Sequence, residues 1–399
     1  MTENTQAWQV NGEPKTIVDL LSRLVRCASV TPSSDGVLDV VEAALVPLGF
    51  ACTRLTFTGD GSYPVENLFA TRKGSLPGPH LLFGGHTDVV PPGDEAAWTH
   101  PPFGAEIVGD TMYGRGTVDM KSGIAAFCGA LARLAGEGRL EAGTVSLAIT
   151  NDEEADAVNG TAKLMEWAAA QGHRFDFAIV GEPGSKETVG DSIKIGRRGS
   201  LTGRVTVEGV QGHVAYPERA ANPMPVLAAI ATALDAPLDD GSAHFQPSNL
   251  EVVSIDTGNP VSNVIPARGT LLFNVRFNDG WTGETLRAEI ERRIAAVPHG
   301  QCRSRFEVTG PISRAFLCPA EDAQPLVAAI EAETGRAPEL STGGGTSDAR
   351  FIAHYCPVVE LGLVGRGLHQ VDEQVPLADL ERLTALYARV IAHILGGRP

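Results

Sequence analysis

Three short apolar runs, each followed by polar residues, constrain the fold of this chain more than any other feature. They extend from His80 to Val90, from Thr144 to Thr150 and from Phe175 to Val180. Between them, Lys121 to Leu134 and Thr161 to Ala170 have the composition and spacing of helices. Buried strands that alternate with helices predict an α/β architecture with a doubly wound, mainly parallel sheet.

The pattern changes after Lys194. Ile195 to Glu208 alternates apolar and polar residues, which predicts a half-exposed antiparallel strand. Helical and strand patterns then follow one another in β-α-β-β-α-β order as far as Val308, the order of a ferredoxin-like unit. This segment therefore predicts an α+β domain inserted into the first.

The α/β pattern resumes after Pro311, with helices expected near Ala323 to Glu333 and Ala378 to Leu395. A chain of 399 residues is long enough for two domains with ample cores. We therefore expect a discontinuous catalytic domain at 1–194 and 312–399, and an inserted domain at 195–311.

Charge and cysteine content restrict the class of partner and the compartment. The formal net charge is −16, which disfavours nucleic acid, although a few converging arginines could still bind a small anion. The six cysteines form no CxxC pair, as expected for reduced thiols of a cytoplasmic protein.

The N-terminal segment and the hydropathy of the chain predict neither a signal peptide nor a membrane span. The polar segment Met1 to Lys15 lacks the apolar stretch of a signal peptide, and Met1 to Pro14 is expected to be a mobile leader. No run reaches about 18 consecutive apolar residues, so no membrane span is predicted.

Imidazoles and carboxylates follow the predicted strands at the points where those strands end. His86 and Asp88 follow the first run, Glu153 and Glu154 the second, and Glu182 the third. Because carboxyl ends of parallel strands share one edge of a sheet, these side chains are expected to lie together. Asp119 precedes a predicted helix, and His369 lies between a predicted strand and the last helix.

Each of these residues alone also has an ordinary structural interpretation. His86 could be structural in a glycine-rich turn, Asp119 could be a helix N-cap, and Glu153 with Glu154 could be a solvated surface pair. Taken together, the set suits two divalent ions that activate a water, with one glutamate left over as the general base.

Several longer motifs show a resemblance to a known family. The chain resembles the M20 metallopeptidases over nearly its full length. The matching segments are Gly84 to Asp94, Tyr113 to Gly123, Thr150 to Thr161, Gly181 to Pro183, Ile193 to Leu201, Gln211 to Pro217, Ser262 to Pro266 and Gly344 to Phe351.

The resemblance implies roles for the metal-site residues. Asp119 would bridge two zinc ions, for which cobalt or manganese could substitute. His86 and Glu182 would bind one ion, and Glu154 and His369 the other. Glu153 would be the general base, and Asp88 would orient His86.

The resemblance also assigns roles to the inserted domain, as a lid and a dimerisation surface. His213 would reach into the active site of the partner subunit and stabilise the oxyanion, so a homodimer is expected. Among M20 members the chain is similar to those that hydrolyse N-succinyl-LL-2,6-diaminopimelate, in lysine and diaminopimelate biosynthesis. The substrate-binding residues would be Arg197, Ser200, Tyr216, Asn263, Arg276, Gly345 and Thr346.

The expected substrate has three carboxylates, and a guanidinium pairs with a carboxylate through two parallel hydrogen bonds. Arg197 and Arg276 are therefore expected to contact it, whereas Arg198 is expected to form a structural ion pair. The glycine-rich segment 343–347 is either a flexible loop or an anion-binding loop.

Two other functions remain open at this point. One keeps the chemistry and changes the substrate, as in acetylornithine deacetylation or the hydrolysis of dipeptides or acyl-amino acids. The other is a metal-binding protein without activity, for which a general base such as Glu153 would have no use.

Overall fold

The computed structural model describes residues 8–10 and 13–396 and divides into two units. The first comprises residues 1–195, 318–341 and 347–399, and the second comprises residues 196–317 and 342–346. Most of the expected leader lies outside the described residues, although Trp8–Val10 (β1) pairs with Glu13–Lys15 (β2). The expected domains had boundaries at residues 194/195 and 311/312, and they did not assign 342–346 to the second unit.

The first unit is built on an eight-stranded sheet with the order β19-β10-β20-β9-β5-β8-β4-β3. Strands β20, β9, β5 and β8 are parallel to one another, and β4 and β3 extend the sheet as an antiparallel hairpin. The strands are β3 (Ala51–Gly59), β4 (Ser62–Lys73), β5 (Leu76–His86), β8 (Ala142–Thr150), β9 (Phe177–Val180), β10 (Ser192–Lys194), β19 (Glu339–Ser341) and β20 (Val358–Glu360).

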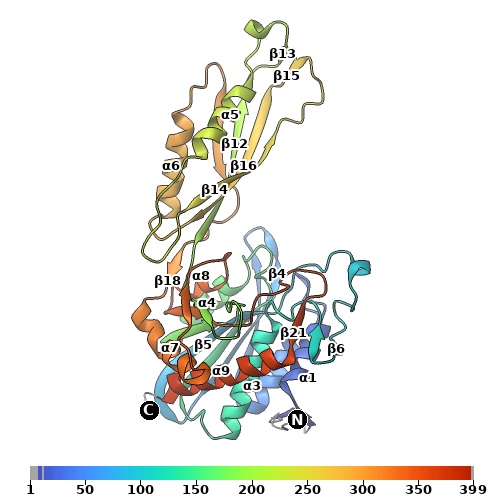
Figure 1. Ribbon diagram of the computed structural model, residues 1–399, viewed down its shortest axis with the longest axis vertical. Helices are drawn as coiled ribbons and strands as arrows, with labels where there is room; N and C mark the ends of the chain where they lie inside the picture. The colour runs from blue at the N-terminus through green and yellow to red at the C-terminus, as the bar shows by residue number, and fades with distance from the viewer. Residues whose placement is uncertain (1–7, 11–12, 397–399) are drawn as a thin grey trace. The chain divides into compact units, whose positions relative to one another are not determined.

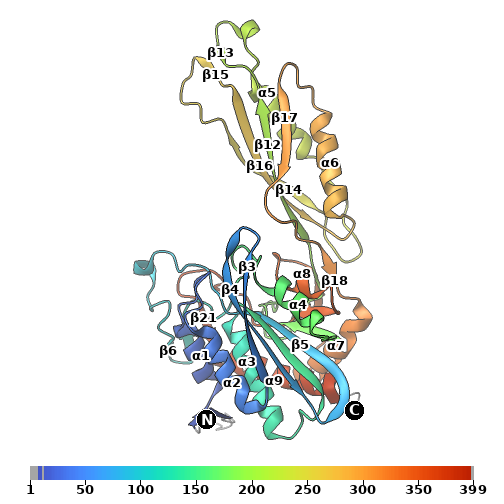
Figure 2. The ribbon, with the colours of Figure 1, turned by 180° about the vertical axis from the view of Figure 1, so that it is seen from behind.

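Helices cover both faces of this sheet, which confirms the doubly wound α/β prediction (Figures 1 and 2). They are α1 (Ile17–Arg26), α2 (Val37–Leu45), α3 (Lys121–Gly136), α4 (Thr161–Ala170), α7 (Ala320–Thr334), α8 (Ala349–Ile352) and α9 (Leu377–Gly396). Helix α1 begins at a capping box between Thr16 and Asp19, in which each side chain bonds the other's backbone N–H.

Two adjacent glycines near the end of β5 show how closely the helices approach the sheet. A Cβ on Gly84 would lie 2.6 Å from Cδ1 of Ile352 in α8, and one on Gly85 would lie 2.8 Å from Cε of Met120 beside α3. Because successive residues of a strand face opposite sides, α3 and α8 lie on opposite faces. The carboxyl end of β5 is therefore held between two helical layers.

A small three-stranded sheet lies beside this core, with the order β21-β7-β6. It joins β6 (Glu106–Val108) and β7 (Thr111–Tyr113) to β21 (Gln374–Pro376). This sheet brings the chain that leads into Asp119 next to the chain that follows His369.

The second unit has a four-stranded antiparallel sheet with the order β14-β16-β12-β17. Its elements are β12 (Gly199–Glu208), α5 (Pro223–Leu234), β14 (Asn249–Asp256), β16 (Arg268–Phe277), α6 (Gly283–Ala295) and β17 (Arg303–Val308). Helices α5 and α6 pack on one face around Leu227, Ile230, Phe273 and Ile290. Both the element order and the strand order are those of the ferredoxin-like unit expected from the sequence.

Two short ribbons complete the second unit. One joins β13 (Gly212–His213) to β15 (Val264–Ile265), and the other joins β11 (Gly196–Arg197) to β18 (Phe316–Leu317). Within this unit the β13–β15 ribbon and β18 lie at opposite ends of the four-stranded sheet, in both ribbon views (Figures 1 and 2). Among the described residues, no helix has the length and apolar character to cross a membrane.

Candidate metal centre

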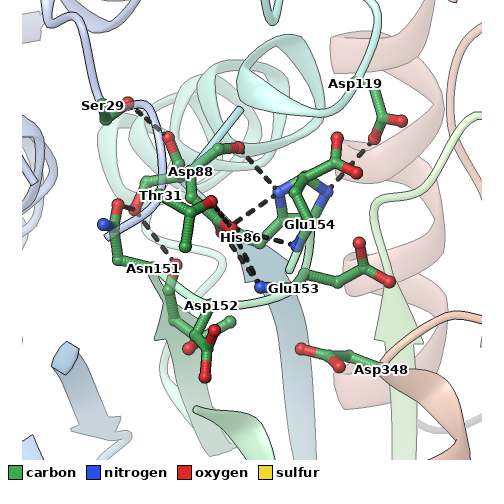
Figure 3. A network of polar contacts seen from close by, with 12 residues as sticks. Ser29, Thr31, His86, Asp88, Asp119, Asn151, Asp152, Glu153, Glu154 and Asp348 are labelled. Atoms are coloured by element: carbon green, nitrogen blue, oxygen red, sulfur yellow. Dashed lines mark hydrogen bonds and ion pairs between the residues drawn. The ribbon is translucent and has the colours of Figure 1, made fainter. Parts of the chain in front are cut away.

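The carboxyl edge of the parallel strands gathers the residues expected to bind metal. His86 is the last residue of β5, Glu153 and Glu154 follow β8, and Glu182 follows β9. Asp119 reaches the same place from the loop before α3. Figure 3 shows the side chains of His86, Asp119 and Glu154 gathered around the end of β5.

Asp119 lies between two histidines and contacts each through a different carboxylate oxygen. Its Oδ1 is 3.1 Å from Nε2 of His86, and its Oδ2 is 3.2 Å from Nε2 of His369. His86 Nε2 is also 3.4 Å from Oε1 of Glu182, and His369 Nε2 is 3.0 Å from Oε1 of Glu154. The cluster therefore has two halves, each with one histidine and one glutamate, which share Asp119.

Asp88 fixes the position of the two glutamates as well as that of His86. Its Oδ2 accepts hydrogen bonds from the backbone N–H groups of Glu153 and Glu154, both at 3.0 Å, and from Thr31 Oγ1 at 2.8 Å. Nδ1 of His86 is 3.0 Å from the backbone carbonyl oxygen of Asp88 and 3.5 Å from its carboxylate. The ring is thus bonded to the Asp88 main chain, while the carboxylate organises the loop after β8.

The concentration of carboxylates changes the proton affinity of His86, His369 and Glu182. Burial lowers the pKa of His86, but the nearby carboxylates of Asp119, Asp88 and Glu182 outweigh it and raise this pKa well above its usual value. Contacts with Asp119 and Glu154 raise the pKa of His369 to about 10. Burial, followed by the charge of Asp119, raises the pKa of Glu182 to about 7.

These shifts show that the cluster attracts positive charge, either as protons or as cations. Ligand atoms of His86, Asp119 and Glu154 lie within 4.8 Å of one another, and so do those of His86, Glu153 and Glu182. Imidazole and carboxylate ligands at such spacing suit divalent transition metals. The residues present therefore fit a dinuclear metal centre.

Glu153 and Glu154 are adjacent in sequence but have different surroundings. The Glu154 carboxylate contacts His369, whereas no hydrogen bond or ion pair joins the Glu153 carboxylate to any residue that the structure describes. Burial, followed by the charge of Glu182, raises the pKa of Glu153 well above its usual value. This glutamate has the environment of a proton acceptor beside the centre.

Two buried carboxylates near the centre, Asp348 and Glu373, were not predicted from the sequence. Asp348 accepts a hydrogen bond from Thr161 Oγ1 at 2.6 Å and contributes to the raised pKa of Glu153. Glu373 is fully buried and pairs with Arg115 at 2.7 Å. The only sequence signal was position, since Arg115 lies just before Asp119 and Glu373 just after His369.

The residues expected to bind substrate all belong to the second unit, where they form two groups. The first group lies near β11, where Arg197 Nη1 donates to the carbonyl oxygen of Gly345 at 3.2 Å, next to Thr346. Ser200 on β12 pairs in register with Arg276 on β16. Arg198 donates to the amide oxygen of Asn249 at 2.7 Å, so the expected structural ion pair is replaced by a neutral partner.

The second group lies on the β13–β15 ribbon and comprises His213, Tyr216 and Asn263. The rings of His213 and Tyr216 are 5.8 Å apart, and the carbonyl oxygen of Asn263 accepts from Val214 N at 3.1 Å. Nδ1 of His213 accepts the backbone N–H of Ala215 at 3.0 Å, which places the proton of the neutral ring on Nε2. The exposed Nε2–H is therefore a hydrogen-bond donor.

The fold and this centre define a dinuclear metal-dependent hydrolase. The model of Peptidase family M20/M25/M40 matches residues 82–393, and the chain belongs to this family. Succinyl-diaminopimelate desuccinylase of Rhodopseudomonas palustris (strain TIE-1) is 54% identical over 379 residues, which cover 94% of this chain and 97% of that protein.

Solved structures of more distant proteins share the fold. The M20 family metallo-carboxypeptidase Sso-CP2 from Sulfolobus solfataricus has a TM-score of 0.75 at 15% identity, over 96% of this chain and 99% of that one. The YXEP protein of Bacillus subtilis, a dinuclear metal binding peptidase, has a TM-score of 0.68 at 14% identity, over 95% and 96%.

Proposed function

We propose that the protein hydrolyses N-succinyl-LL-2,6-diaminopimelate to succinate and LL-2,6-diaminopimelate, a step in lysine and diaminopimelate biosynthesis. The single observation that carries the proposal is the Asp119 carboxylate between His86 and His369, each beside its own glutamate. The similarity to succinyl-diaminopimelate desuccinylases over 94% of the chain supports the choice of substrate.

The proposed cofactor is a pair of zinc ions. His86 and Glu182 would bind one ion, His369 and Glu154 the other, and Asp119 both. When bound, such ions polarise the amide carbonyl and make a water more acidic.

Glu153 is proposed as the general base and then the general acid. A carboxylate oxygen of Glu153 takes one proton from the water as its oxygen adds to the amide carbon. The same oxygen then delivers that proton to the amide nitrogen as the carbon–nitrogen bond breaks. The raised pKa of Glu153 favours retention of the proton between these two events.

Substrate recognition is assigned to the second unit. Arg197 and Arg276 would pair with carboxylates of the substrate, and Ser200, Gly345 and Thr346 would supply further hydrogen bonds. In support, Ser200 and Arg276 are partners in the sheet, and Arg197 contacts Gly345. A guanidinium is suited to this task because its planar donors match a carboxylate.

We also propose a homodimer in which the partner subunit's His213, with its Tyr216 and Asn263, completes the site. The two groups lie at opposite ends of a sheet whose 10-residue strand β12 spans roughly 33 Å, so one small substrate cannot contact both groups of a single subunit. The Nε2–H of His213 is the donor that an oxyanion requires.

The edge of this unit suits dimerisation. Strand β14 is the last strand of its sheet, and its Val253 and Ile255 side chains are 60% and 53% exposed. A long edge with exposed apolar side chains is a surface on which a second strand can pair. We further propose a cytoplasmic location, supported by six free cysteines.

The test compares succinyl and acetyl substrates of the purified, zinc-loaded enzyme. Arg276→Gln should lower kcat/KM for the succinyl substrate at least about 100-fold, because one charge-assisted pair is lost. Arg268→Gln, on the same face of β16, is the matched control and should change little. Equal losses in the two variants, or faster hydrolysis of an acetyl substrate by the wild-type enzyme, would favour a deacetylase or another acyl-amino-acid hydrolase.

A further inference from the structure

A buried ion pair ties together the two chain segments that carry Asp119 and His369. Arg115 and Glu373 are 2% and 0% exposed, and their side chains meet at 2.7 Å. Neither residue belongs to the proposed metal ligands. A buried pair of this kind must be satisfied by further hydrogen bonds to be tolerated, and its other partners show what it holds.

Glu373 accepts hydrogen bonds from the loop that ends at Asp119. Its Oε1 accepts from the backbone N–H of Val118 at 2.7 Å and of Asp119 at 3.3 Å. Its Oε2 accepts from the backbone N–H of Gly116 at 3.1 Å, in addition to Arg115. One carboxylate therefore fixes the main chain at Asp119.

Arg115 binds the other segment, at the residue that carries the second imidazole. Its Nη2 donates to the carbonyl oxygen of His369 at 3.4 Å, and its Nη1 donates to that of Gln370 at 3.3 Å. Trp98 covers the guanidinium, with 5.2 Å from its carbon to the ring centre. The pair thus joins the backbone of Asp119 to the backbone of His369.

The backbone around His369 needs such support. His369 and Asp372 have φ angles of 61° and 55°, in the left-handed region that non-glycine residues rarely adopt. Conformations of this kind persist where the surroundings over-determine them, and they concentrate at functional sites. The hydrogen bond from Arg115 to the His369 carbonyl is one such restraint.

We propose that Arg115 and Glu373 are positioning residues that fix Asp119 and His369 relative to each other, and so set the affinity of the ion held by His369 and Glu154. The proposal rests on the dinuclear centre proposed above. Because no hydrogen bond or ion pair joins His86 or Glu182 to the pair, the ion they would bind depends on it only through Asp119. Loss of the pair should therefore lower the affinity for the ion held by His369 and Glu154 more than the affinity for the other ion.

The test titrates Co²⁺ into the metal-free, full-length protein, followed by calorimetry and by the visible spectrum of the bound ion. Glu373→Gln should lower the affinity for the ion held by His369 and Glu154 about 10–100-fold, as the loss of outer-sphere partners of metal ligands does. The affinity for the ion held by His86 and Glu182 should stay within about threefold of the wild-type value. Excess Co²⁺ should restore kcat, with KM within about twofold of the wild-type value. The matched control is Glu381→Gln, which removes an Arg133–Glu381 contact between α3 and α9.

The proposal would be overturned if the affinities for both ions fell equally, or if neither affinity changed. If Glu373→Gln does not fold, Arg115→Lys supplies the second test, since a lysine keeps the charge but cannot reach Glu373 and both carbonyls together. It should show the same selective loss with a smaller magnitude, and a wild-type spectrum with wild-type affinities would contradict the inference. A wild-type protein that binds fewer than two ions would count instead against the dinuclear centre itself.

Discussion

Oδ2 of Asp119 lies 3.2 Å from Nε2 of His369, and this contact joins two loops that are far apart in the sequence into one centre. The other oxygen of Asp119 contacts His86 at 3.1 Å. A carboxylate in this position can neutralise two positive groups at once. The arrangement explains why the cluster raises the pKa of both histidines.

Asp88→Asn should lower kcat while leaving the fold intact. The variant keeps the volume but loses the charge that accepts the N–H groups of Glu153 and Glu154. We expect a loss of about 10–100-fold in kcat, because both glutamates lose their orientation. Steady-state kinetics at saturating zinc measures it, and unchanged kcat would show that the loop after β8 holds itself in place.

The metal-free protein should lose stability as the pH rises. Folding raises the pKa of Glu182 from 4.5 to about 7 and that of His369 from 6.5 to about 10. The folded state therefore binds more protons, so its extra stability is present at low pH and is lost as the pH rises through these folded values. The Tm of the metal-free protein should be lower at about pH 9 than at about pH 6, and bound zinc should reduce this difference.

The same protons should be released when zinc binds. Calorimetry at neutral pH in buffers of different ionisation enthalpy should detect about two to three protons released per chain, one from each histidine and part of one from Glu182. Affinity for zinc should accordingly increase with pH over the same range. Binding without proton release would mean that the histidines are neutral in the metal-free protein.

The continuous apolar runs predicted β5, β8 and β9 because these strands are buried on both faces. The hairpin of β3 and β4 was not predicted, since β3 is mostly exposed or half-exposed and carries no apolar run. The ferredoxin-like order was predicted because alternation marks strands with one covered face. The assignment of residues 342–346 to the second unit depends on tertiary contacts, which local sequence patterns do not predict.

His86, Glu153, Glu154 and Glu182 were predictable as neighbours because the ends of parallel strands converge on one edge. Glu373 and Arg115 were not, because a fully buried ion pair between two loops leaves no periodic signal in the sequence. The bonding of the Asp88 carboxylate to the loop after β8 likewise depends on a turn whose geometry the sequence does not specify. Spacing alone did not distinguish Glu153 from Glu154; the family resemblance did, and in the structure it is Glu154 that contacts His369.

Mixing two inactive variants should restore activity if His213 acts on the partner's site. Glu153→Ala lacks the base and His213→Ala lacks the donor, so a mixed dimer has one complete site. Random exchange of equal amounts should therefore return activity to about a quarter of the wild-type value. Activity that stays at the level of the separate variants, with exchange verified by tagged subunits, would place His213 in its own subunit's site.

Val253→Lys should convert the proposed dimer into monomers. The residue is 60% exposed on the edge strand β14, and an edge lysine disfavours strand pairing. Sedimentation should show a dimer dissociation constant at least about tenfold higher than that of the wild type, and kcat should fall in parallel. Val108→Lys, at a residue 52% exposed on β6 of the first unit, is the control and should remain dimeric. A dimer that survives Val253→Lys would locate the interface elsewhere.

The most direct test of the central claim measures bound zinc and succinyl-amide hydrolysis in the same samples of wild-type protein and Glu153→Ala. We predict two zinc ions per chain in both proteins. Hydrolysis should occur in the wild type and fall about 10²–10⁴-fold in the variant, because only the proton acceptor is removed. Near-wild-type hydrolysis by Glu153→Ala, or full hydrolysis by wild-type protein stripped of metal, would contradict the account.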